Sequence, residues 1–180
     1  DYGPDIIEIS GKKFGTTYRL TIVADQPAPA DLPEMIESEL NKIDVSMSTY
    51  KSSSEINQFN RLNTNIPFNI SEHFASVIEI SENIWLESGG AFEPTIGPLV
   101  DLWGFGPDVK SDKVPSDSDI ASAIEAIGFD AISTKVAMSG TTLSKSRSVR
   151  LDLSAVAKGY AVDVLANLLE SYALPAYVIE

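Results

Sequence analysis

The order of the hydrophobic repeats constrains the fold of this chain more than any other feature of its sequence. Residues 16–23, TTYRLTIV, alternate apolar and polar positions, which predicts a half-buried strand. Residues 32–43 and 71–88 instead repeat apolar side chains at helical spacing. Strand and helix patterns then follow one another without the strict alternation of βαβ units, so the predicted fold class is α+β.

Short polar and glycine signals indicate where these elements begin and end. Capping signals open four expected helices, at Asp31, Ser52, Ser71 and Ser116. Gly89-Gly90 is expected to end the third of these helices, because glycine readily adopts the backbone conformation found just past a helix end. Residues 135–146, KVAMSGTTLSKS, predict a hairpin that turns at Ser139-Gly140.

The chain stops inside an apolar strand pattern, AYVIE at residues 176–180. An apolar strand needs a neighbour, and a finished domain rarely ends at such a point. We therefore expect residues 1–180 to be the N-terminal part of an incomplete domain, with a strand partner for residues 176–180 supplied by another copy or by the rest of the protein. The first residue, Asp1, is not a methionine, which is consistent with removal of a leader.

Composition excludes several classes of partner and site. The formal net charge is −13, from 13 basic and 26 acidic residues, which argues against nucleic acid and anionic membranes as partners. The chain has no cysteine, so it has neither disulfides nor thiolate metal ligands. His73 is the one histidine and is expected in a solvated first helical turn, so neither a Ser-His-Asp triad nor a multi-histidine zinc site is predicted.

The segment RLDLSAVAKGYAVD, residues 150–163, predicts a short strand followed by a helix that Ser154 caps. Lys158 falls in the second turn of that helix, where it adds a full charge to the positive helix N-terminus. Gly159 leaves room for a ligand to approach the backbone. The segment therefore fits an anion site, and it equally fits a strand packed on a helix that carries an exposed lysine.

The segment AFEPTIGPLVDLWGFGP, residues 91–107, has no simple structural period. Long irregular segments in compact domains are commonly functional. Phe92, Trp103 and Phe105 could stack on a flat ring, and Glu93 and Asp101 could accept hydrogen bonds from ring or sugar donors. The alternative interpretation is a rigid loop that covers the core.

Four segments together resemble the ApbE family, whose members are FAD:protein FMN transferases. They are GKKFGTTY, STYKSSSEINQFN, GGAFEPTIGPLVDLWGFGP and DLSAVAKGYAVD, at residues 11–18, 48–60, 89–107 and 152–163. The last two are highly specific and the first two are supporting, and the resemblance extends over essentially the whole chain.

The resemblance implies tandem T-fold-like α+β units that hold FAD. It implies Mg²⁺-dependent transfer of FMN from FAD to a Thr or Ser hydroxyl of a target flavoprotein, with release of AMP. The implied targets are subunits of membrane redox complexes of the sodium-pumping quinone reductase or Rnf type. It further implies export to the periplasm or cell envelope, with a lipid anchor at the N-terminus of the full precursor.

The family's binding positions can be carried over residue by residue. Those implied to bind FAD are Phe14, Tyr50, Ala91, Phe92, Glu93, Asp152 and Lys158. The backbone carbonyl of Ala155 is implied to be a Mg²⁺ ligand. Phe14 and Glu93 stand where many members have Met and Asp, which affects the placement of the flavin rather than the resemblance itself.

Residues 1–180 contain neither the family's Ser-His-x-x-Asp-Pro-like segment nor its metal-binding Asp and Thr side chains. The catalytic residues are therefore expected in the C-terminal part, and these residues alone are expected not to transfer FMN. Two other functions stay open from the sequence: a flavin-binding carrier or assembly factor that does not transfer, and a Mg²⁺-dependent pyrophosphatase that splits FAD into FMN and AMP.

Overall fold

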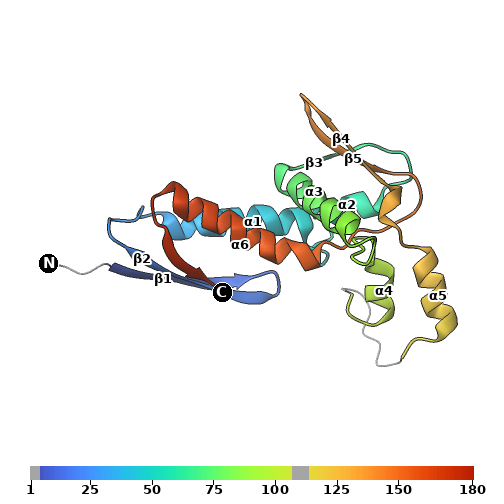
Figure 1. Cartoon of the computed structure of the whole chain (residues 1–180), viewed down its shortest axis with the longest axis horizontal. Coiled ribbons are helices and arrows are strands. Elements are labelled where there is room, and N and C mark those ends of the chain that lie inside the picture. The colour runs from blue at the N-terminus through green and yellow to red at the C-terminus, as the bar shows by residue number, and fades with distance from the viewer. Residues whose placement is uncertain (1–4, 107–113) are drawn as a thin grey trace. The chain divides into compact units, whose positions relative to one another are not determined.

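The computed structural model describes residues 5–106 and 114–180, and the chain divides into two compact units. The first unit comprises residues 1–44 and 157–180, and the second comprises residues 45–156. The chain passes from one unit to the other within two helices, α1 (Leu32–Met47) and α6 (Ser154–Ser171). Helices and strands are mixed in both units (Figure 1), which confirms the predicted α+β class.

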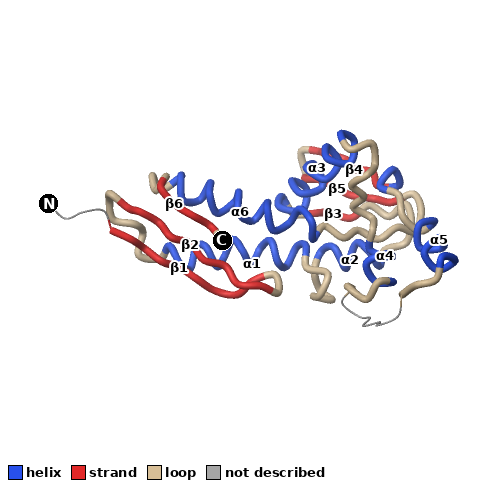
Figure 2. Tube along the Cα trace, turned by 60° about the horizontal axis from the view of Figure 1, so that its bottom comes forward, coloured by secondary structure: helices blue, strands red, loops and turns tan. Residues whose placement is uncertain are grey.

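The first unit is an antiparallel sheet with α1 and α6 over one of its faces (Figures 1 and 2). Its strands lie in the order β1 (Asp5–Lys13), β2 (Thr16–Ala24) and β6 (Ala176–Ile179). Leu20 and Ile22 of β2 are fully buried, as are Ile36 and Ile43 of α1. The alternation predicted for residues 16–23 is therefore confirmed.

The C-terminal strand has its partner within this chain. β6 pairs antiparallel with β2, with Leu20 opposite Ile179, and Arg19 and Glu180 exchange two backbone hydrogen bonds of 2.9 Å. The expectation that residues 176–180 would take their partner from outside residues 1–180 is thus wrong for this edge. β2 is flanked by β1 on one side only, and its second edge accepts β6, a long-range pairing that local sequence patterns do not reveal.

The described residues of the second unit combine a small antiparallel sheet with four short-to-medium helices. The sheet order is β3 (Phe68–Ile70), β5 (Gly140–Lys145) and β4 (Ile132–Ala137). The helices are α2 (Glu55–Arg61), α3 (Glu72–Glu87), α4 (Gly97–Leu102) and α5 (Asp117–Glu125), with a 3₁₀ turn, η1 (Phe129–Ala131). No helix among the described residues is long and apolar enough to cross a membrane.

The predicted helix starts are confirmed in part. The Ser71 hydroxyl accepts a hydrogen bond from the third residue of α3, and Ser116 forms both halves of a capping box in α5. Ser54, and not Ser52, caps α2, because Ser54 has the extended backbone of a cap and a buried side chain directed at the helix. The hairpin of β4 and β5 turns at Met138-Ser139, shifted by one residue from the predicted Ser139-Gly140.

Residues 150–153 do not form the predicted strand. Ser154 is the first residue of α6 and not its cap. The two leucines of this segment are buried as the pattern suggested, but the backbone of the segment bonds to the Asn60 side chain and to the Pro94 carbonyl, not to a neighbouring strand.

Candidate functional site

A pocket of about 290 Å³ in the second unit brings together Tyr50 and Asp152, two of the residues implied to bind FAD. Its lining comes from residues 49–61, from α4 and from residues 150–152. We call it the Tyr50–Asp152 pocket. These two residues were identified through the family resemblance. They lie a hundred residues apart in sequence, and the fold brings both to the same cavity.

The loop that carries Tyr50 is held by an amide side chain of α2. Asn57 donates through Nδ2 to the backbone carbonyls of Thr49 (2.8 Å) and Lys51 (2.9 Å). Arg61, one turn further along the same helix, donates to the carbonyl of Ser52 (2.8 Å). Tyr50 itself is 73% exposed, so its ring is available to a ligand.

A second amide of α2 holds the segment that carries Asp152. Asn60 donates through Nδ2 to the carbonyl of Leu151 (2.9 Å) and accepts through Oδ1 from the backbone N–H of Leu151 (2.8 Å). This pair of hydrogen bonds reproduces what a neighbouring strand would provide. Residues 150–153 are thus fixed without belonging to a sheet.

A buried lysine supports this arrangement from within the unit. Lys145 is 2% exposed and donates to the carbonyls of Asn60 (2.9 Å) and Val149 (3.2 Å), with its ammonium 5.3 Å from the ring centre of Phe59. Burial lowers the pKa of Lys145 below its usual value. The lysine therefore connects the end of α2 to the chain just before the pocket residues.

Charges of both signs line the Tyr50–Asp152 pocket. Arg150 forms an ion pair with Asp101 of α4. Gly97 permits this approach of α4, because a Cβ there would lie 3.3 Å from the Arg150 guanidinium. Together with the ring of Tyr50, the pocket offers a stacking surface, guanidinium donors and carboxylate acceptors. This combination suits a ligand that joins a flat base to hydroxyls and phosphates.

Asp152 keeps part of its carboxylate free for a ligand. Its backbone N–H donates to the carbonyl of Pro94 (2.8 Å), and its Oδ1 accepts from the backbone N–H of Ser154 (2.9 Å). Within the described part of the chain, no hydrogen bond occupies its second oxygen. The side chain is therefore oriented by the start of α6 and retains one acceptor atom in the pocket.

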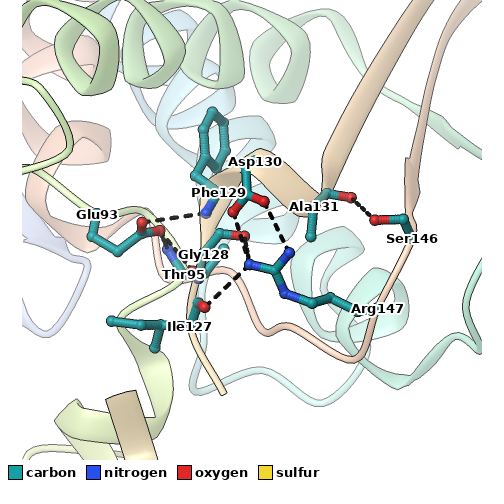
Figure 3. A network of polar contacts seen from close by, with 9 residues as sticks. All are labelled: Glu93, Thr95, Ile127, Gly128, Phe129, Asp130, Ala131, Ser146 and Arg147. Carbon is teal, nitrogen blue, oxygen red and sulfur yellow. Dashed lines mark hydrogen bonds and ion pairs between the residues drawn. The ribbon is translucent and has the colours of Figure 1, made fainter. Parts of the chain in front are cut away.

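The predicted segment of Ala91, Phe92 and Glu93 lies in the same unit but does not line this pocket. The backbone N–H of Phe92 donates to the Ser88 hydroxyl (3.0 Å), which follows the end of α3. Both oxygens of Glu93 accept hydrogen bonds from the protein itself (Figure 3). Its role as a direct contact of the cofactor stays a prediction, and its carboxylate already has three protein donors.

Phe14 lies in the first unit, at the turn between β1 and β2. It lines an open pocket of about 590 Å³ at the tip of this hairpin. Phe14 and Gly15 have φ of 55° and 75°, the two positive values of a two-residue turn that glycine and asparagine favour. A bulky residue in this conformation is strained, and strain of this kind concentrates at functional sites.

Behind this turn, polar side chains fix the hairpin against α1. Lys13 forms an ion pair with Glu37 and donates to Asn41 (2.8 Å), and the Tyr18 hydroxyl donates to Glu37 (2.9 Å). Burial and the hydrogen bond to Glu37 raise the pKa of Tyr18 to about 12. The hydrogen bond from Lys13 lowers the pKa of Glu37.

The two remaining predicted positions lie near the start of α6. Lys158 is exposed and, among the described residues, makes no ion pair. Ala155 lies in the first turn, where a regular helix directs its carbonyl toward the N–H of Gly159. No group of three or more His, Cys, Asp or Glu among the described residues could hold a metal ion. The role of the Ala155 carbonyl as a Mg²⁺ ligand stays a prediction.

Sequence reasoning missed several residues of the Tyr50–Asp152 pocket. Asn57, Asn60 and Arg61 line it from α2, and Arg150 lines it from the coil before α6. Asn57, Asn60 and Arg61 are spaced at positions i, i+3 and i+4, which places them on one helix face. The sequence NQFNR could therefore have indicated this polar face. The ion pair of Arg150 depends on the approach of α4, which no local pattern shows.

The chain matches the model of the ApbE family over residues 14–180. It is 37% identical to a FAD:protein FMN transferase of Haemophilus influenzae and 35% identical to one of Vibrio cholerae, each over 97% of this chain and 52% of the relative. The chain thus spans about half the length of the curated relatives it matches.

Solved structures give the same result. The flavin transferase ApbE of Vibrio cholerae has a TM-score of 0.90 at 34% identity, over 98% of this chain and 57% of that structure. The apo form of the Pseudomonas stutzeri flavinyl transferase ApbE also has a TM-score of 0.90, at 30% identity, over 99% and 57%. By the family model and by these relatives, the chain belongs to the ApbE family.

Proposed function

We propose that this chain is the FAD-binding part of an enzyme that transfers FMN from FAD to a Thr or Ser hydroxyl of a target flavoprotein. The observation that carries the proposal is the Tyr50–Asp152 pocket, in which two implied FAD contacts meet guanidinium and amide side chains. The names of the relatives, FAD:protein FMN transferases, support the same activity.

In the proposed reaction, the acceptor hydroxyl oxygen forms a bond to the phosphorus of the FMN half. The bond from this phosphorus to the bridging oxygen breaks, that oxygen leaves with its electron pair as part of AMP, and the hydroxyl proton is released. Phosphoryl transfer of this kind depends on positioning and on stabilising charge. Tyr50, Arg150 and Asp152 are proposed to bind and orient FAD, and no catalytic proton transfer is assigned to them.

We propose that the reaction requires Mg²⁺, which in such reactions offsets negative charge on phosphate oxygens. This proposal rests on the family resemblance, which implies the Ala155 carbonyl as one ligand. We also propose targets among membrane redox complexes, of the quinone reductase or Rnf type, and a location in the periplasm or cell envelope with a lipid anchor. Fractionation of cells that express the tagged gene product tests the location.

The decisive experiment uses the complete gene product, FAD, Mg²⁺ and a target domain with a single acceptor Thr. We expect a covalently flavinylated target and one AMP per transferred FMN, and loss of both products with EDTA. Free FMN with AMP would instead identify a pyrophosphatase, and FAD binding without either product would identify a carrier. Either of these outcomes would refute the transferase.

Variants connect the activity to the pocket. Asp152→Ala should weaken FAD binding by about 1–3 kcal/mol, the range for losing a hydrogen bond to a charged group. Lys158→Ala should weaken it by a similar amount, because Lys158 is a proposed contact of the cofactor. Glu82→Ala removes an exposed carboxylate of α3 in the same unit, outside the pocket, and should leave binding unchanged. Unchanged affinity in Asp152→Ala would contradict the assignment of the pocket.

A further inference from the structure

Thr95 is fully buried, and its hydroxyl has both a donor and an acceptor role (Figure 3). It accepts from the backbone N–H of Gly128 at 2.6 Å, so its own proton is directed to Glu93 Oε1, also at 2.6 Å. The backbone N–H of Thr95 donates to the same carboxylate oxygen at 2.9 Å. The direction of each hydrogen bond is therefore fixed, because the Gly128 N–H can only donate.

Thr95 binds the turn at residues 128–130, and a second side chain, Arg147, also holds this turn. Glu93 Oε2 accepts from the backbone N–H of Phe129 at 3.2 Å. Arg147 holds the same turn through two hydrogen bonds to Asp130, of 2.9 and 2.7 Å. Gly128 has φ of 141°, a backbone conformation that residues with a Cβ rarely adopt, so the turn favours glycine.

Pro94, between Glu93 and Thr95, connects the anchored turn to the pocket. Its carbonyl accepts the backbone N–H of Asp152 at 2.8 Å. The three residues 93–95 thus bind the turn at residues 128–129 with their side chains and bind Asp152 with their backbone. A displacement of Thr95 would be passed to Asp152 through a single peptide unit.

We propose that Glu93 and Thr95 are positioning residues that act on the cofactor through Asp152 and do not contact it themselves. The proposal rests on the proposed function and assigns a different role to Glu93 than the family resemblance does. Its physical basis is that the Glu93 carboxylate is already the acceptor for two backbone groups and one hydroxyl. One oxygen of the Asp152 carboxylate, in contrast, accepts no hydrogen bond from the described residues.

The test compares Thr95→Val, which keeps the shape of the side chain and loses the hydroxyl, with Thr95→Ser, which keeps the hydroxyl. FAD affinity in the complete gene product should fall about tenfold or more in Thr95→Val, since two hydrogen bonds, one of them to a carboxylate, are lost. Thr95→Ser should restore most of it. The control Thr142→Val makes the same replacement on half-buried β5 and should leave affinity unchanged.

A double-mutant cycle separates positioning through Asp152 from general loosening of the fold. In the Asp152→Ala background, Thr95→Val should cause little further loss of affinity, because its effect passes through the missing carboxylate. Additive losses would overturn the proposal, as would wild-type affinity in Thr95→Val. The saturated transfer rate should also stay close to wild type, whereas a residue that contacts the reacting atoms would lower it.

Amide hydrogen exchange tests the positioning step without any cofactor. In the free protein, the Asp152 N–H should exchange faster in Thr95→Val than in wild type or Thr95→Ser, because its acceptor carbonyl is less firmly held. Equal exchange in all three proteins would overturn the positioning role even if FAD binds. If wild type binds no FAD, the proposed function fails, and the exchange rates still decide whether Thr95 positions Asp152.

Discussion

Replacement of Asn60 by alanine should destabilise the second unit well beyond the usual effect of a surface substitution. The change deletes two hydrogen bonds to the backbone of Leu151, of 2.9 and 2.8 Å. Leu151 is 1% exposed, so its N–H and carbonyl would be left without their partners in a largely dry position. A buried backbone group without a partner costs roughly 1–3 kcal/mol.

The expected magnitude follows from these two groups. If the N–H and the carbonyl of Leu151 each cost the upper limit of this range, the loss would be about 6 kcal/mol. Asn60 lines the pocket, however, so water that enters there can replace part of the lost hydrogen bonding. We therefore expect a loss of about 2–3 kcal/mol in the free energy of unfolding. Most surface substitutions stay within about 0.5 kcal/mol.

Tryptophan fluorescence during urea unfolding is a suitable assay, because both tryptophans of the chain, Trp85 and Trp103, lie in the second unit. Gln58→Ala is the matched control. Gln58 is an exposed amide of the same helix with one hydrogen bond to the carbonyl of Ser53 (2.8 Å). If Asn60→Ala destabilises the unit no more than Gln58→Ala does, the pair of hydrogen bonds to residue 151 does not hold the segment, and the reasoning is wrong.

Two further predictions concern the first unit. The pKa of Tyr18 is raised to about 12, so the contribution of this residue to stability should be complete at pH values below the usual tyrosine pKa and should be lost as the pH rises through 12. Ultraviolet titration should show one tyrosine that ionises at a higher pH than the others, and Tyr18→Phe should remove this transition. Phe14→Asn relieves a positive φ and should leave the unit at least as stable in thermal unfolding, while FAD affinity of the complete protein falls; a lower melting temperature with unchanged affinity would assign Phe14 a purely structural role.

Local signals predicted the elements whose stability comes from their own residues. β2 has alternating side chains, and α5 has a capping box, and both are where the sequence indicates. α4 was not predicted, because it lies in a segment rich in glycine and proline, although Pro98 at its first turn is compatible with a helix start. β1 was missed because its apolar residues do not alternate cleanly in the sequence: Ile6 is apolar but 69% exposed, next to the less exposed Ile7.

The strand predicted for residues 150–153 is absent because this backbone segment takes its hydrogen bonds from a distant side chain. Residues 150–153 have the buried leucines of a strand, but their partner is Asn60, ninety-one positions away from Leu151. The candidate site shows the same limit. Tyr50 and Asp152 were identified through the family resemblance, and their meeting in one pocket depends on contacts that no window of sequence contains.

Two parts of the wall of the Tyr50–Asp152 pocket, residues 49–52 and 150–152, are coil, and polar side chains hold that coil in place. Asn57 fixes the loop of Tyr50, and Asn60 fixes the segment before Asp152. Thr95 is anchored to the turn at Gly128, and its neighbour Pro94 accepts the Asp152 N–H. Each of these residues replaces the backbone partner that a sheet would supply. Coil fixed in this way can follow the outline of a ligand more freely than strands can, but each segment then depends on one side chain. Substitutions of such supporting residues should therefore alter cofactor affinity as strongly as substitutions of the contacts themselves.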